Sequence, residues 1–283
     1  MSKCSMFKHT VFNRKVFCCF GYVIAFLGSF AGFLHGQESA SRIQSLKTIA
    51  ESSNYQATAT EAQVLSFLKA IDEFSPHANL TTIGETTEGR PLHTIVLSKE
   101  VNNPLPLAAN DPRLVVLVLG GIHSGECDSK EAVLAMARDW VTRADLMDKL
   151  EKAVFVILPN FNADGNERVG TLHRPGQEGP ILGMGTRENA AGLDLNRDFI
   201  KLDSPEVRSL VRAFDAWDVD VLFDCHTTNG SLHQYDLTYD IPHNPAANQK
   251  ILTWLRKEFL PIVGEELKKA GLPIFYYGNF SAD

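Results

Sequence analysis

The sequence predicts an α/β protein with a mostly parallel or mixed central sheet and helices on both faces of that sheet. Two short apolar runs, Leu114–Leu119 and Ala153–Leu158, have the length and composition of strands buried on both sides. A helical pattern that begins near Asp128 and continues to Trp140 separates them. A strand, a helix and a second strand in this order form a right-handed crossover, so the two strands should be parallel.

The elements on either side of this unit follow from local signals. Before it, Thr60–Phe74 has apolar residues at a helical period behind Thr60, and the turn at 88–91 followed by Leu92–Leu97 indicates a hairpin. After it, Ser204 and Pro205 start a helix that runs to about residue 217. The apolar run Val219–Asp224 predicts another buried strand.

Composition restricts the function classes. The chain has 283 residues, is 44% hydrophobic and carries a formal charge of −7, which is typical of a globular protein with a sizeable core. Four of its basic residues and none of its acids fall in 1–36, so the rest is more acidic than the total suggests. This acidity argues against a nucleic-acid partner and against binding to an anionic membrane surface.

Residues 1–36 have the pattern of a targeting segment. A basic region ends at Lys15, the run Val16–Leu34 is apolar apart from Gly and Ser, and polar residues follow from Gln37. We interpret this segment as a secretory signal peptide, and its length leaves open an uncleaved N-terminal anchor. Either interpretation places the folded part outside the cytoplasm, in a secreted or periplasmic protein.

Outside the targeting segment the chain has two cysteines, Cys127 and Cys225, so it is not a disulfide scaffold. They directly neighbour Glu126 and His226. We expect two buried thiols, and a disulfide between them stays open at this stage.

Metal-binding residue types follow two of the predicted strands. Leu114–Leu119 ends at two glycines, and His123 and Glu126 come directly after them. Two intervening residues let an imidazole and a carboxylate bind one ion and leave room for a third ligand. Because ligands bind at the carboxyl ends of strands in α/β sheets, His226, at the end of Val219–Asp224, is expected at the same edge. Two histidines and one carboxylate are typical ligands of a catalytic zinc.

The segment from Pro159 to Leu193 is long, rich in glycine and irregular. A loop of this length in a compact domain is usually functional. Its polar side chains are therefore candidates for the wall of a site.

Five motifs in order, IGETTEGRP, GGIHSGE, NADG, GLDLNRD and DCH, resemble the zinc metallocarboxypeptidases of the carboxypeptidase A type. The resemblance covers the chain from about Thr60 to His226. It implies a carboxypeptidase A-like fold, one bound Zn²⁺ and hydrolysis of the C-terminal bond of peptides or proteins. Residues 37–283 would then form the catalytic domain.

The resemblance also implies roles for single residues. His123, Glu126 and His226 would bind the zinc ion. Asp194, two residues before Asn196, matches the family carboxylate that accepts the second N–H of the first histidine ligand. Such a partner fixes the tautomer and makes the imidazole a better donor.

Further roles concern the substrate. Asn196 and Arg197 match the pair that binds the terminal carboxylate, a task for which the planar guanidinium is suited. Arg187 is the candidate for the arginine that polarises the scissile carbonyl, and Arg174 is the alternative.

The sequence departs from the family pattern in its last part. The family's catalytic Glu lies well downstream of the third ligand, whereas Glu258, Glu265 and Glu266 here belong to an amphipathic helix predicted over Pro245–Ala270. We therefore expect a chain that is incomplete at its C-terminus, lacks the general base and is essentially inactive, although it still binds zinc weakly.

Two other departures concern the substrate. Gly125 stands where the family often has an arginine, so one substrate contact is expected to be missing. Asp198 follows Arg197 where Asn is commoner, and its carboxylate could partly neutralise the pocket.

Two alternative functions remain. A deacylase of N-acyl amino acids, similar to the aspartoacylase group, shares the Gly-Gly-x-His-x-x-Glu turn and the Asn-Arg pair. A non-catalytic zinc-dependent peptide-binding domain would account for the missing Glu. The EGR hairpin and the long loop favour a peptidase over the deacylase.

Overall fold

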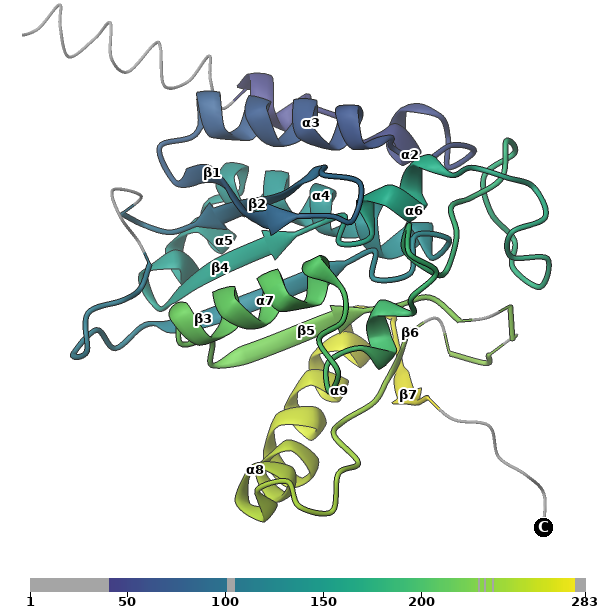
Figure 1. Cartoon of the computed structure of the whole chain (residues 1–283). Coiled ribbons are helices and arrows are strands. Elements are labelled where there is room, and N and C mark those ends of the chain that lie inside the picture. The colour runs from purple at the N-terminus through teal and green to yellow at the C-terminus, as the bar shows by residue number, and fades with distance from the viewer. Residues whose placement is uncertain (1–40, 101–104, 229, 232, 236, 278–283) are drawn as a thin grey trace, which may run out of the picture. The chain divides into compact units, whose positions relative to one another are not determined.

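A computed structural model describes residues 41–100, 105–228, 230–231, 233–235 and 237–277. The chain divides into two compact units, 1–229 and 230–283, and each is considered by itself. The first unit is built on a five-stranded sheet (Figure 1). Its strands are β1 (Ala78–Glu85), β2 (Pro91–Leu97), β3 (Leu114–Gly120), β4 (Ala153–Leu158) and β5 (Val221–Cys225).

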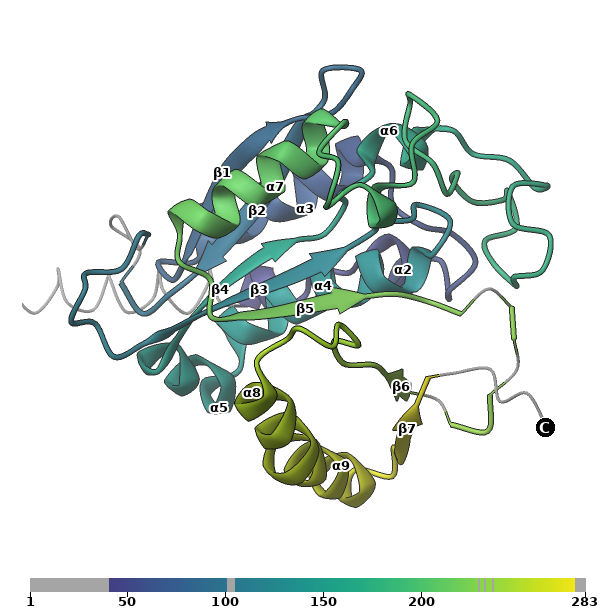
Figure 2. The ribbon, with the colours of Figure 1, turned by 60° about the horizontal axis from the view of Figure 1, so that its bottom comes forward.

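The sheet is mixed, as the sequence predicts, and its strand order is β1-β2-β4-β3-β5 (Figure 2). β3 lies between β4 and β5 and runs parallel to both, whereas β1, β2 and β4 pair in antiparallel fashion. In register, Leu119 of β3 pairs with Leu158 of β4 and with Asp224 of β5. The carboxyl ends of the three parallel strands therefore meet at one edge.

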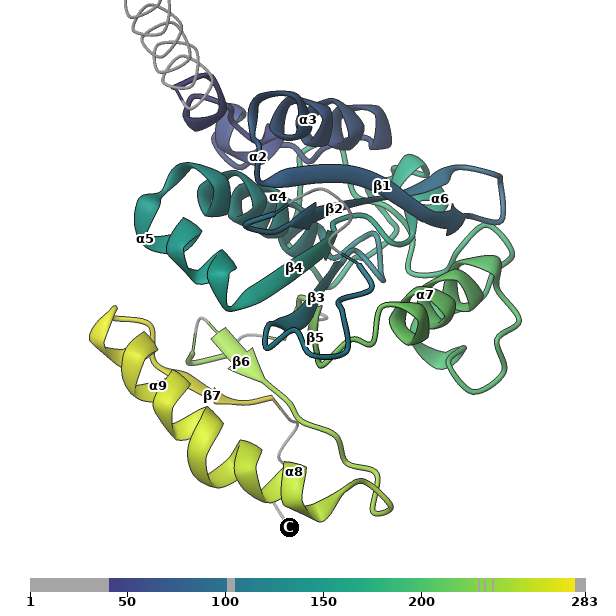
Figure 3. The ribbon, with the colours of Figure 1, turned by 90° about the vertical axis from the view of Figure 1, so that its left-hand side faces the viewer.

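Helices cover both faces of the sheet, which confirms the predicted fold class. Figure 3 shows α3 (Glu61–Phe74) and α4 (Cys127–Thr142) away from α7 (Pro205–Ala216), with the sheet between them. Successive residues of a strand point to opposite faces, and β3 shows the result. Val116 and Val118 pack in the core on the side of α3 and α4, and Val115, Leu117 and Leu119 pack on the side of α7.

The helices begin where the capping signals predict. Thr60 caps α3, with its side chain on the N–H of Gln63 and the Gln63 side chain on the Thr60 N–H. The Ser204 side chain caps α7 by accepting the N–H of Val207, and Pro205 is the first residue of that helix. The remaining short elements of this unit are α2 (Ile49–Ser52), α5 (Ala144–Met147), η1 (Asp148–Glu151), α6 (Ala163–Glu167) and η2 (Leu195–Arg197).

Two expectations for this unit need correction. The stretch 159–193 is not wholly irregular, because α6 forms where the Asn162 side chain accepts the N–H of Gly165. β5 begins at Val221, two residues later than predicted, and it is not the buried strand that was expected, because it lies at the edge of the sheet with Leu222 and Phe223 41% and 45% exposed. Asp218 has a φ of 50° and the Val219 N–H bonds the Phe214 carbonyl, so the chain is still leaving α7 at that point.

In the second unit, α8 (Gln249–Trp254), η3 (Leu255–Phe259) and α9 (Leu260–Lys269) form one continuous helical segment. It begins four residues later than the predicted start at Pro245, because the Asn248 side chain caps it by accepting the Lys250 N–H. β7 (Ile274–Tyr276) pairs in parallel with β6 (Leu237–Tyr239), a strand that the sequence did not indicate.

The targeting segment predicted over residues 1–36 lies outside the described residues. Within the described ranges, no helix combines the length and apolarity needed to cross a bilayer.

Candidate metal centre

Two glycines at the end of β3 allow the segment that follows β4 to approach closely. The N–H groups of Phe161 and Asn162 donate to the carbonyls of Gly120 and Gly121. Gly121 has a φ of +67°, and a Cβ at Gly120 would lie 2.8 Å from the Pro159 carbonyl oxygen. This close approach places the loops after β3 and β4 side by side at the carboxyl edge.

The three predicted metal ligands meet at this edge. His123 and Glu126 lie in the turn between β3 and α4, where the Glu126 N–H donates to the His123 carbonyl, and His226 follows β5 directly. Nδ1 of His123 lies 3.0 Å from Oε1 of Glu126, and Nδ1 of His226 lies 2.9 Å from Oε2 of the same carboxylate. One candidate ligand atom from each of the three residues lies within 4.8 Å of the other two.

This donor set fits zinc. Two imidazole nitrogens and a carboxylate are protein ligands that leave a catalytic zinc one open position. The His123 and Glu126 side chains are 3% and 4% exposed, so the carboxylate is taken out of water and needs positive partners. Burial raises the pKa of Glu126, but hydrogen bonds from His123, His226 and the Thr227 N–H outweigh it and lower that pKa below its usual range.

Both histidines have a carboxylate at the ring nitrogen that faces away from Glu126. Nε2 of His123 lies 3.1 Å from Oδ1 of Asp194, and Nε2 of His226 lies 3.0 Å from Oδ2 of Asp224. Burial lowers the pKa of His226, but Asp224 and Glu126 outweigh it and raise that pKa to about 9. Asn196 reaches the same ring, with its amide nitrogen 3.3 Å from Nε2 of His226.

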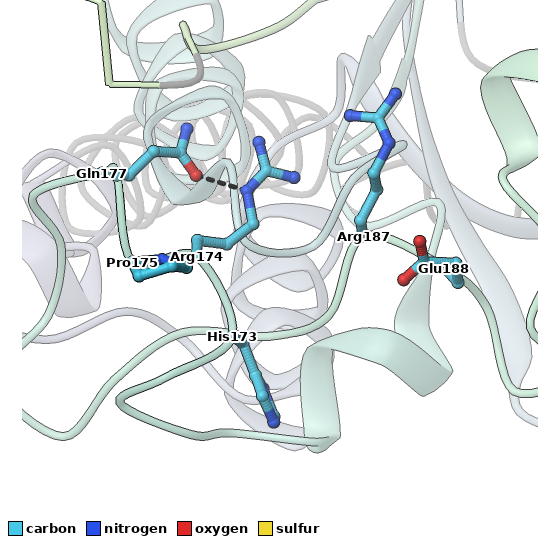
Figure 4. Close-up of a pocket in the computed structure, with 7 residues that line it drawn as sticks. His173, Arg174, Pro175, Gln177, Arg187 and Glu188 are labelled. Atoms are coloured by element: carbon cyan, nitrogen blue, oxygen red, sulfur yellow. Dashed lines mark hydrogen bonds between the residues drawn. The ribbon is translucent and has the colours of Figure 1, made fainter.

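Both candidate arginines lie beside the three ligands. Arg187 bonds Asp194 through Nε at 3.0 Å, and its Nη1 lies 3.4 Å from Nδ1 of His123. Arg174 is 8% exposed and bonds Oε1 of Glu126 through Nη2 at 2.8 Å. They line a pocket of about 390 Å³, in which Figure 4 shows their guanidinium groups on the same side and His173 turned away.

Arg174 crosses the turn that carries His123 and Glu126 directly over Gly125. A Cβ at Gly125 would lie 2.6 Å from Cγ of Arg174 and 2.9 Å from the Gly185 carbonyl oxygen. A side chain at position 125 would therefore occupy the space that the Arg174 side chain fills. The departure from the family at Gly125 leaves room for a cation that arrives from the long loop.

Gln177 connects Arg174 to the segment that follows His226. Its Oε1 accepts from Nε of Arg174 at 2.5 Å, and its amide nitrogen donates to the Thr228 carbonyl, two residues after His226. The loop that carries Arg174 and Gln177 is thereby hydrogen-bonded both to Glu126 and to the segment after His226.

The motifs TTEGR and NADG occur together because one buried carboxylate joins them. Asp164 of α6 is fully buried and accepts from the Thr86 hydroxyl at 2.7 Å and the Glu88 N–H at 2.9 Å, and it pairs with Arg90 at 2.5 Å. The preceding Asn162 donates to the carbonyls of residues 187 and 188. This short helix thus fixes both the hairpin turn and the backbone that carries Arg187.

The residues expected at the substrate carboxylate lie on η2. Arg197 is exposed, and its Nη1 donates to the Asn196 carbonyl at 2.9 Å. The expectation that Asp198 neutralises this pocket is wrong. Asp198 is 4% exposed and its carboxylate accepts from the N–H and hydroxyl of Ser204 and the N–H of Asp203, so it supports the start of α7.

The cysteines beside the candidate ligands carry free thiols, and both are half-buried where the sequence predicted buried thiols. Cys127 is the first residue of α4, a position that usually favours a thiolate, but burial raises its pKa. Burial, reinforced by the charge of Asp224, raises the pKa of Cys225 to about 11. Both are therefore poor nucleophiles.

Sequence reasoning missed Asp224 and the packing role of Arg174. Asp224 could have been found, because it stands two residues before His226 on a predicted strand, and such residues share a face. The contact of Arg174 with Glu126 joins residues 48 positions apart through a loop, and no local signal indicates it.

Comparison with known proteins agrees with this geometry. The sequence model of the family described as "Zinc carboxypeptidase" matches residues 64–263. The protein called carboxypeptidase E from Caenorhabditis elegans is 33% identical over 187 residues, which are 64% of this chain and 34% of that protein. "Inactive metallocarboxypeptidase ecm14" of Sclerotinia sclerotiorum is 29% identical over 136 residues, 44% of this chain and 21% of that protein.

Solved structures show the same fold. The crystal structure of a metallo-carboxypeptidase from Burkholderia cenocepacia aligns with a TM-score of 0.58 and 22% identity over 81% of this chain and 55% of that one. The chain thus covers about a third of the named relative from C. elegans and about half of the solved structure. This chain belongs to the zinc carboxypeptidase family.

Proposed function

We propose that this chain carries a zinc-dependent metallocarboxypeptidase site for the C-termini of peptides or proteins. His123, Glu126 and His226 would hold one Zn²⁺. The observation that carries the proposal is the grouping of their ligand atoms within 4.8 Å of one another at the carboxyl edge of the sheet. Family membership supports it.

The side chains around the centre suit this reaction. When bound, zinc supplies a Lewis acid and lowers the pKa of a water molecule to near 7. Asp194 holds the His123 ring in place from behind. Arg187, within 3.4 Å of that ring, is positioned to stabilise negative charge on a carbonyl oxygen, and Arg197 presents an exposed guanidinium for a terminal carboxylate.

Proton transfer is the remaining requirement. Among the described residues, Glu126 is the one glutamate bonded to either His123 or His226. As a ligand, it would not act as the general base. We therefore expect zinc and peptide binding by this chain with little or no turnover, which makes a zinc-dependent peptide-binding role the second candidate.

Binding and turnover can be measured on the same purified chain. Zinc affinity is determined by competition with a chromophoric chelator. Fluorescence anisotropy compares a labelled tripeptide that has a free C-terminus with its C-terminal amide. The proposal predicts one zinc per chain, loss of zinc binding in His226→Ala, and at least tenfold weaker binding of the amide, because the charge-assisted bonds to Arg197 are lost.

Matched variants and substrates decide between the candidates. Arg197→Ala should bind the free tripeptide about as weakly as the amide, while Arg212→Ala, an exposed arginine on α7, should match the unmodified protein. Release of the terminal amino acid at a rate normal for such enzymes would contradict the expected inactivity. Faster hydrolysis of an N-acetyl amino acid than of the tripeptide would favour the deacylase. Absence of zinc binding would overturn the proposal.

We also propose that residues 1–36 are a signal peptide, that 37–283 form the catalytic domain, and that the protein acts outside the cytoplasm. The N-terminal pattern of a basic region followed by an apolar run supports this. The size of the secreted chain, compared with that of the full translation product, tests it.

A further inference from the structure

The two candidate ligand histidines are held in the same way. In each ring Nδ1 faces Glu126, and Nε2 faces an aspartate at 3.0–3.1 Å. Asp194 plays this part for His123, as the family resemblance implies. We propose that Asp224 is a second positioning residue, which accepts the Nε2–H of His226 and so orients the ring with Nδ1 toward the metal. This inference rests on the proposed function.

The strand geometry explains how Asp224 reaches the ring. Asp224 and His226 are two residues apart at the end of β5, so their side chains point to the same side of the strand. Cys225, between them, points to the other side and packs against the core near α4. The side chains of Asp224 and His226 are 30% and 32% exposed, so the pair is only partly shielded from water.

Asp224 and Glu126 face opposite nitrogens of the same ring. A carboxylate only accepts hydrogen bonds, so the contacts of 3.0 Å at Nε2 and 2.9 Å at Nδ1 each favour a proton on their nitrogen while no metal is bound. A metal ion bound at Nδ1 would replace the proton there, and Asp224 would hold the remaining proton on Nε2. The Asn196 amide is a weaker competitor, because it is neutral and lies farther away, at 3.3 Å.

The two aspartates differ in what else they bind. Both oxygens of Asp194 have further donors, namely Arg187 at Oδ2 and the Asn196 N–H at Oδ1. Within the described part of the chain, the Asp224 carboxylate makes its hydrogen bond to His226 alone. Asp224 is therefore the less neutralised partner and strengthens its histidine as a donor to the metal more than Asp194 does.

Two substitutions separate charge from shape. Asp224→Ala removes the acceptor and should weaken zinc affinity about 10- to 100-fold, the usual effect of losing such a partner. Asp224→Asn keeps an oxygen of the same reach without the charge. Its zinc affinity should lie between that of the unmodified protein and that of Asp224→Ala. Asp215→Asn makes the same change of charge at an exposed position on α7 and should leave zinc affinity within twofold.

A second measurement distinguishes positioning from general stability. Nitrogen-15 NMR of the zinc-loaded protein should show zinc on Nδ1 of His226 and the proton on Nε2 in the unmodified chain and in Asp215→Asn. Asp224→Ala should show a mixture of binding through Nδ1 and binding through Nε2. Circular dichroism of the variants checks that they remain folded. If Asp224→Ala does not fold, the isosteric variant Asp224→Asn is measured in its place.

The outcomes are distinct. If the unmodified chain binds zinc and the Asp224 variants bind it equally well, the role of Asp224 is overturned while the proposed function stands. If the unmodified chain binds no zinc, the proposed function and this inference fail together. Binding of zinc through Nδ1 alone in both Asp224 variants also overturns the role of Asp224.

Discussion

Replacing Glu61 with Gln should stabilise the protein at alkaline pH and have little effect at acidic pH. Glu61 is the first residue of α3, and its side chain is 14% exposed. Burial and the charge of Glu167 raise its pKa from 4.5 to about 7, against the lowering effect of the Asn160 hydrogen bond and the charge of Lys130. The folded state therefore prefers the neutral acid, which Gln resembles in shape.

The sign and size follow from proton linkage. The Glu61 carboxyl has a higher pKa in the folded state than in the unfolded state, so the folded state binds its proton more tightly. This stabilises the folded state fully below pH 4.5, and the stabilisation is lost as the pH rises through 7. At 1.36 kcal/mol for each pH unit between the two values, the cost at pH 8 is about 3 kcal/mol. The advantage of Glu61→Gln should therefore grow by about 2.5 kcal/mol from pH 5 to pH 8.

Urea unfolding followed by circular dichroism at both pH values measures this difference. Glu73→Gln is the matched control, since Glu73 is an exposed residue of the same helix, and its effect should stay within about 0.5 kcal/mol. Equal effects of Glu61→Gln at pH 5 and pH 8 would refute the reasoning. So would a greater loss of stability at pH 8, which would mean that the charged form is favoured by the start of α3.

Other perturbations give simpler results. Gly125→Ala should lower the free energy of unfolding by about 1–3 kcal/mol, because the new Cβ meets Arg174 and the Gly185 carbonyl, and a urea titration measures it. Leu119→Ala, at a fully buried site on β3, should cost about 2–5 kcal/mol in the same assay; a loss under 1 kcal/mol would contradict that burial. Zinc at a hundredfold excess over its Kd should add about 2.7 kcal/mol, a gain that a chelator reverses and His226→Ala abolishes.

Local signals predicted the elements of the first unit well. Thr60, Ser204 and the run 153–158 mark the starts of α3 and α7 and the whole of β4, because caps and buried apolar runs act within a few residues. α6 was missed, since it has only five residues, includes a glycine and depends on the Asn162 cap.

The surroundings of the candidate site were harder to predict than the grouping of the three candidate ligands. His123, Glu126 and His226 follow strands whose ends must meet, so topology alone brings them together. The partners of Asp198 and Arg174 depend on how loops fold back on the sheet. Asp198 finds Ser204 six residues away, which a search restricted to the site would not consider.

One consequence concerns α6 and its two polar residues. Asn162 holds the backbone at 187 and 188, while Asp164 holds the turn at 86–90. A displacement of this single helical turn would shift the backbone that carries Arg187 and the hairpin together. The loop at 187–188 and the turn at 86–90 are consequently coupled through one helical turn, so a substitution that moves one of these segments should also move the other.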